Sequence, residues 1–172
     1  MPNQFFLEIL RHLQETRFRD LAGTRVSGTV PVSERLINEV VASVVPRGAP
    51  VREVRVQPLP GNRFSVRVSP RAPLLPAVTL KLEIERQADL PSSPVLVLRM
   101  ATMGGLLGIA SAALPIANML PPGVKLEADR ILVDLRVIAA ERGAADLLEH
   151  VTQLRVNTEE GRVVLHVDLA VD

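Results

Sequence analysis

Hydrophobic and polar residues recur along this chain with two periods, one typical of helices and one typical of strands. Apolar residues recur every three to four positions in segments 3–17 and 33–45, which predicts two amphipathic helices. Ser33 is a favourable N-cap for the second helix. That helix is rich in valine, and β-branched side chains lose rotamer freedom in helices, so we expect packing to hold it in place.

An alternation with a period of two predicts the strands. The segment 95–100 is instead apolar on both faces, which predicts a strand that is covered on both sides. Between the last predicted strands we expect one more helix, over residues 139–150. The alternating segments are 25–32, 54–68 with a turn at 59–62, 78–85, 124–128, 131–137 and 153–172 with a turn at 159–161.

Two parts of the chain resemble each other. Residues 51–61 align with residues 151–161, and a helix preceded by a strand comes before each hairpin. Residues 64–68 match 163–167 with a shift of one position. The order of elements therefore predicts an internal repeat of strand, helix, strand, turn and strand.

The segment from Met100 to Val124 contains no charged side chain, although 23% of the chain is charged. Three interpretations fit it: a transmembrane helix, a helix buried inside the protein, or an apolar surface that contacts lipid or lines a cavity. A spanning helix needs roughly 20 apolar residues. The strongly apolar part, 104–120, is near the lower limit, and Pro121 and Pro122 end it.

The chain of 172 residues fits a single domain, with an N-terminal amphipathic helix in 1–22 and an α+β body in 23–172. Hydrophobic residues make up 47% of it but aromatic residues only 2%, which favours aliphatic ligands over bases, sugars or peptides. There is no cysteine, so disulfides and thiolate metal sites are excluded. The first residues lack the pattern of a secretory signal, so we expect a cytoplasmic protein, with peripheral membrane contact as an option.

The net charge of +1 conceals an uneven distribution. Segment 47–71 has six arginines and one acid, a charge of +5, whereas segment 127–172 has ten acids and five arginines, a charge of −5. The two segments could neutralise each other within the fold or between subunits, or the arginines could meet anionic headgroups. A nucleic-acid partner is not expected, because the basic segment is short and has no interleaved aromatic residues.

The sequence offers no group of residues suited to catalysis. His12, His150 and His166 are each explained by a solvated or helix-capping position. No spacing typical of a zinc site, a nucleophile elbow or a phosphate-binding loop is present. We therefore expect a protein that is not an enzyme and that uses no metal or cofactor.

Together these patterns predict an α+β fold in which a curved antiparallel sheet of hairpins wraps two or three helices. A strand that runs into the helix start Val32-Ser33-Glu34-Arg35-Leu36, followed by long hairpins, resembles the tubular lipid-binding (TULIP-like) domains over residues 25–172. The resemblance implies a curved sheet around a helix, with aliphatic side chains lining a groove for acyl chains.

The preferred hypothesis is binding or carriage of a lipid or other aliphatic molecule in an apolar groove between the sheet and the uncharged helix. The alternative is a structural or interaction protein with a closed core and a homo-oligomer interface, such as a homodimer. In the lipid hypothesis, Arg63 and Arg67 approach a phosphate or carboxylate headgroup from the rim. The predicted apolar site residues are Val54, Val56, Phe64, Val66, Val68, Leu80, Leu82 and Ile84 on the sheet and Leu106, Leu107, Ile109, Leu114 and Ile116 on the helix.

Overall fold

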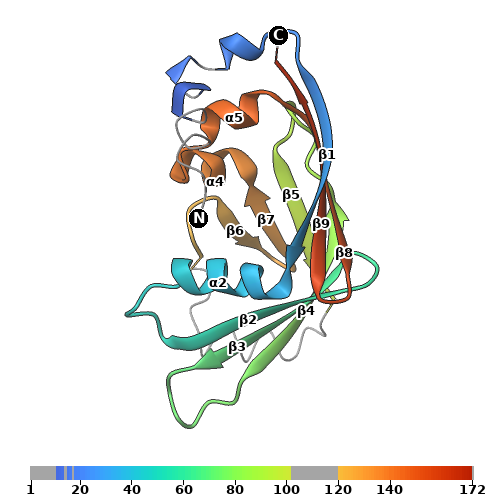
Figure 1. Cartoon of the computed structure of the whole chain (residues 1–172). Helices are drawn as coiled ribbons and strands as arrows, with labels where there is room; N and C mark the ends of the chain where they lie inside the picture. Colours follow the sequence, from blue (N-terminus) through green and yellow to red (C-terminus); the bar gives the residue numbers. More distant parts are fainter. Residues whose placement is uncertain (1–10, 14, 17, 102–119, 172) are drawn as a thin grey trace.

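The computed structural model describes residues 11–13, 15–16, 18–101 and 120–171. Within these residues the fold is α+β, with a strongly curled antiparallel arrangement of nine strands in two sheets (Figure 1). The three-stranded sheet has the order β1-β9-β8, and the six-stranded sheet has the order β2-β3-β4-β5-β7-β6. The strands are β1 (Arg25–Ser33), β2 (Val51–Leu59), β3 (Arg63–Pro70), β4 (Val78–Arg86), β5 (Val95–Met100), β6 (Val124–Glu127), β7 (Arg130–Asp134), β8 (Val151–Glu159) and β9 (Arg162–Ala170).

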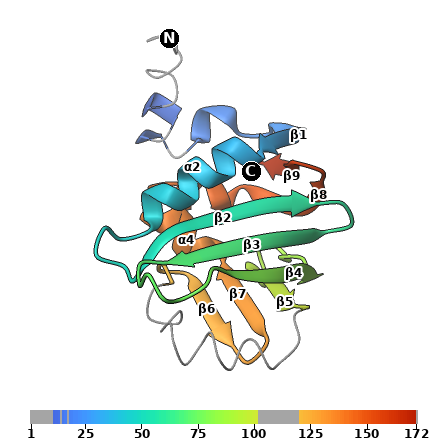
Figure 2. The ribbon, with the colours of Figure 1, turned by 90° about the horizontal axis from the view of Figure 1, so that it is seen from below.

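The valine-rich helix is confirmed as α2 (Glu34–Val44), and it packs along β2 (Figure 2). Ser33 is its N-cap, as predicted, and the Ser33 hydroxyl oxygen accepts a hydrogen bond of 3.3 Å from the amide of Leu36. Of the predicted N-terminal helix, residues 11–13 and 15 are helical and the first ten residues lie outside the described part. A short 3₁₀ helix, η1 (Arg19–Leu21), precedes β1.

The predicted boundaries after β7 were wrong. The strand ends at Asp134 instead of Val137, and helix α4 (Leu135–Glu141) begins at once. The Asp134 carboxylate accepts hydrogen bonds from the amides of Arg136 and Val137, which makes it the N-cap. The single predicted helix is also divided, because Gly143 adopts a positive φ of 67° between α4 and α5 (Ala145–Glu149).

The structure does not confirm an internal repeat. The order strand, helix, hairpin does occur twice, and both hairpins have a bulge at the same place, at 51–53 and at 151–153. The strands that precede the helices are used differently, however, because β1 pairs with β9 whereas β7 pairs with β5. The repeat therefore stays a prediction.

The two sheets are joined where the tips of their hairpins meet. The Thr158 side chain is buried there, with 5% of its surface exposed. Its hydroxyl donates to the carbonyl of Leu59 and accepts from the amide of Arg63, at 2.5 and 2.9 Å. The amide of Gly161 also donates to the carbonyl of Pro58, at 3.2 Å. These bonds link the sheets into one curved layer.

The outer face of the six-stranded sheet carries ion pairs between its strands, one of which reaches from β7 across β5 to β4. Arg130 on β7 donates two hydrogen bonds, of 2.9 and 2.8 Å, to the carboxylate of Glu85 on β4. These bonds lower the pKa of the Glu85 carboxyl from its ordinary value. Arg99 on β5 similarly lies 3.2 Å from Glu83 on β4. The outer arginines of these strands thus have acidic neighbours on the same sheet.

Candidate functional site

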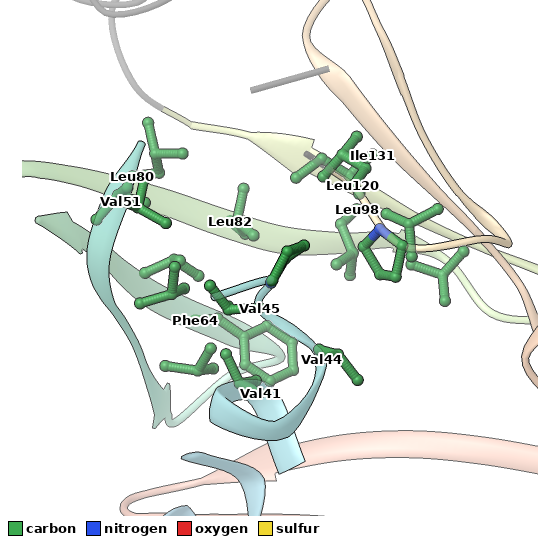
Figure 3. Close-up of a pocket in the computed structure, with 18 residues that line it drawn as sticks. Val41, Val44, Val45, Val51, Phe64, Leu80, Leu82, Leu98, Leu120 and Ile131 are labelled. Atoms are coloured by element: carbon green, nitrogen blue, oxygen red, sulfur yellow. The ribbon is translucent and has the colours of Figure 1, made fainter. Parts of the chain in front are cut away.

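An apolar pocket lies between the inner face of the six-stranded sheet and α2 (Figure 3). Its volume is about 380 Å³, which is within the usual range of small-molecule sites. Every described residue on its wall is Val, Leu, Ile, Phe or Pro. They are Val41, Val44, Val45, Pro46, Val51, Val54, Val56, Phe64, Val66, Val68, Leu80, Leu82, Leu98, Leu120, Pro121, Val124, Ile131 and Val133.

Strand register brings the sheet side of this wall together. Successive side chains of a strand point to opposite faces, and directly paired residues share a face. Val66 of β3 pairs with Val56 of β2 on one side and with Leu80 of β4 on the other. Phe64 pairs with Leu82 in the same way. One apolar face therefore runs continuously across the strands.

The opposite wall comes from the C-terminal half of α2, where Val41, Val44 and Val45 face the sheet (Figure 3). One side chain fixes the position of this helix. The Asn38 amide donates to the carbonyl of Val56 at 2.8 Å, and its oxygen accepts from the Val56 amide at 2.7 Å. Asn38 therefore occupies the free edge of β2 as a neighbouring strand would, and it holds α2 over the pocket.

Side chains on the pocket wall differ in their exposure. Val51 and Val68 line the pocket and, with Ala49, form a compact core in which each residue has less than a tenth of its surface exposed. Other residues of the wall are more exposed, since Phe64 is only partly buried and Val44 is 36% exposed. The wall is therefore part of the packed core at some positions and open to solvent at others.

The structure places seven of the eight predicted sheet residues on the wall of this one pocket: Val54, Val56, Phe64, Val66, Val68, Leu80 and Leu82. Ile84 lies further along β4 and does not line it. The five predicted helix residues, Leu106, Leu107, Ile109, Leu114 and Ile116, lie outside the described residues. Whether a ligand contacts any of these side chains stays a prediction.

The predicted headgroup residues are not brought to the pocket. Arg63 and Arg67 alternate with Phe64, Val66 and Val68 on β3, so their side chains leave from the opposite, polar face of the sheet. Neither arginine lines the pocket. The alternation of side chains along β3 already indicated from the sequence that these two arginines point away from the apolar face.

Sequence reasoning missed the helix wall that the structure describes. It assigned a helix wall to the uncharged segment, most of which lies outside the described residues, although its end at 120–124 does contribute to the lining. It did not assign the wall that α2 and the residues after it supply, which consists of Val41, Val44, Val45 and Pro46. The available signal was the valine stripe of segment 33–45, which we interpreted only as a face that must be buried. The contributions of Leu98 on β5 and of β6 and β7 were also missed, because strand order decides which strands border the pocket.

Among the described residues, the 18 side chains that line the pocket offer only apolar contact, since none of them is titratable or polar. In the described part of the chain, no three His, Asp or Glu residues are grouped closely enough to hold a metal ion. Over the same part, no helix has the length and hydropathy needed to cross a membrane. Most of the uncharged segment, residues 102–119, is not among these residues.

Comparison with protein-family models, with curated proteins and with solved structures gave no match for this chain. The resemblance to the TULIP-like domains therefore stays a prediction.

Proposed function

We propose that this protein binds or carries a lipid or other aliphatic molecule, without catalysing a reaction, in the apolar pocket between the six-stranded sheet and α2. The observation that supports the proposal is a pocket of about 380 Å³ whose wall contains only apolar side chains. Such a wall can recognise hydrocarbon, and it offers no donor or acceptor for a polar ligand group.

Burial of hydrocarbon would favour an occupied pocket, because it removes both the ligand and the apolar wall from water. Each ligand methylene buried here contributes about 0.8 kcal/mol. A hydrocarbon chain could therefore be held without any polar contact.

Native mass spectrometry of the purified protein, followed by solvent extraction and lipid analysis, tests the proposal directly. We expect a stoichiometric aliphatic species that is released by extraction. A protein that carries no such species, and takes up none from added fatty acid, would contradict the proposal.

A tryptophan reporter locates the binding site, because the chain contains no tryptophan of its own. In Val44→Trp the reporter stands at the exposed margin of the pocket, and we expect a brominated fatty acid to quench its fluorescence. Thr79→Trp is the matched control, since Thr79 is exposed on β4 and does not line the pocket. Equal quenching of the two variants would place binding elsewhere.

Filling the pocket provides a second test. Val66→Trp adds bulk to the centre of the sheet wall, so we expect a folded protein with lost ligand uptake, while Thr79→Trp keeps both properties. If Val66→Trp unfolds the protein, its site is part of a close-packed core, and the proposal loses its main support.

An interaction protein remains the second candidate, because β1 presents apolar surface that the described residues leave uncovered. Val26 and Val30 are 50% and 49% exposed on the same face of this edge strand. A homo-oligomer would cover them. Sedimentation over a range of concentrations tests this alternative, and it predicts that Val30→Lys weakens a dimer that the native sequence forms.

A further inference from the structure

Two loops meet at one end of the molecule, next to the apolar pocket. Residues 46–50 connect α2 to β2, and residues 71–77 connect β3 to β4; both views show them at the same end (Figures 1 and 2). Pro46, in the first loop, lines the pocket, and so does Val51, which follows it. We call these two loops the pocket-end loops.

Arg71 ties the pocket-end loops together. Its Nε donates to the carbonyls of Ala49 and Val51, at 2.9 and 3.3 Å, and its Nη2 donates to the carbonyl of Arg47 at 2.8 Å. The amide of Arg71 also donates to the carbonyl of Pro50 at 2.9 Å. These four hydrogen bonds hold the two loops together, so the base of the second loop has a fixed position.

The second loop exposes hydrocarbon at its tip. Leu74 is 94% exposed, the highest value among the large apolar residues described, and Leu75 is 37% exposed. The neighbouring residues in 72–77 are Ala and Pro, all exposed, and none can form an ion pair. Leu74 and Leu75 thus present adjacent apolar surface to water on a loop whose base is held by hydrogen bonds.

The charge beside these leucines has one sign. Arg47, Arg52 and Arg71 are the charged residues of 46–52 and 71–77, so the two segments carry +3 and no acid. Arg47 and Arg52 are exposed. Glu53, the nearest acid in sequence, lies 3.0 Å from Arg55 and is therefore already paired.

We infer that the pocket-end loops dock on an anionic lipid bilayer, with Leu74 and Leu75 inserted at the boundary of headgroups and acyl chains and the arginines against lipid phosphates. Apolar residues combined with basic ones are what interfacial binding requires. The inference extends the proposed function, because this end adjoins the pocket and an aliphatic ligand would have a short route between the two. Docking itself does not need an occupied pocket.

Vesicle flotation tests the inference. We expect the protein to float with vesicles of phosphatidylcholine and phosphatidylserine, to bind phosphatidylcholine alone much more weakly, and to lose binding as salt is raised. Leu74→Gln with Leu75→Gln should reduce binding at least about tenfold. Leu147→Gln is the matched control, because Leu147 is 43% exposed on α5, away from these loops, and it should bind as the native protein does.

A tryptophan placed in the second loop tests the same membrane contact by a fluorescence change that should appear on binding. In Leu74→Trp the fluorescence should shift to the blue on anionic vesicles and be quenched by brominated acyl chains, whereas Thr79→Trp should show neither change. No binding to anionic vesicles, or equal binding by the double variant and the native protein, would overturn the inference.

Ligand analysis of the same samples separates the two proposals. Leu74 and Leu75 do not line the pocket, so the double variant should retain the aliphatic ligand that the native protein carries. A protein that carries ligand but ignores vesicles would overturn the docking inference alone. A protein that binds vesicles but carries no ligand would contradict the proposed function alone.

Discussion

Asn38 is the residue whose removal tests most directly how the pocket is held together. It bonds both backbone groups of Val56 at the edge of β2, at 2.8 and 2.7 Å, and it also donates to the carbonyl of Glu34 at 2.9 Å. In Asn38→Ala each lost bond to Val56 costs about 1 kcal/mol, because these groups are partly buried. The better helix propensity of alanine returns up to about 0.7 kcal/mol. We therefore expect the free energy of unfolding to fall by about 1.3–2 kcal/mol.

Urea unfolding followed by circular dichroism measures this change, since the chain has neither tryptophan nor tyrosine for fluorescence. Arg35→Ala, on the exposed side of α2, is the control; it removes only the surface ion pair with Glu39 and should change stability by less than about 0.5 kcal/mol. Because Asn38 holds the helix wall of the pocket, its loss should also speed ligand release. A decrease in the free energy of unfolding of Asn38→Ala that is no larger than that of Arg35→Ala would refute the reasoning.

Three further substitutions test contacts between segments that are distant in the sequence. Thr158→Val removes the hydroxyl that joins the two hairpin tips and should lower the free energy of unfolding by about 1–3 kcal/mol in the same urea assay. Gly123→Ala places a Cβ within 3.0 Å of the Asp134 carbonyl oxygen at a φ of +85°, so calorimetry should show a loss of about 1–3 kcal/mol. Glu85→Gln removes the ion pair with Arg130. The folded-state pKa of Glu85 is lowered, so the pair stabilises the fold above the unfolded-state pKa and is lost as pH falls through the folded-state value. The melting temperatures of variant and native protein should therefore differ at neutral pH and converge in acid, and a gap that persists in acid would contradict this account.

Most strands could be predicted because their evidence is local. The hairpins that turn at 59–62 and 159–161 have alternating side chains, and the turns contain the glycines that adopt positive φ, Gly61 and Gly161. The both-sided burial of β5 was also predictable, since Leu96 and Val97 are adjacent, point to opposite faces and are 8% and 4% exposed. The end of β7 was missed because the capping function of Asp134 interrupts an apolar pattern that suits a strand or a helix equally well.

One part of the candidate site could also be predicted from the sequence, and another part could not. Alternation was enough to select seven side chains of one apolar wall, and it also indicated that Arg63 and Arg67 leave β3 on the opposite face. The second wall could not be selected, because it depends on the bond between Asn38 and Val56, which are 18 positions apart. The exposed leucines of the pocket-end loops were missed as well, since exposure depends on what packs over a loop.

By itself, the sequence determined which residues share a face, where most strands and α2 lie, and that any internal binding surface would be aliphatic. These properties depend on side-chain periods and composition, which act over a few neighbouring residues. The tertiary structure decided the strand order, the helix that faces the sheet, the joint at Thr158 and the hollow between α2 and β2–β5. Those features depend on contacts between distant segments, because edge strands and apolar faces have several partners that would satisfy them, and only the complete packing selects one.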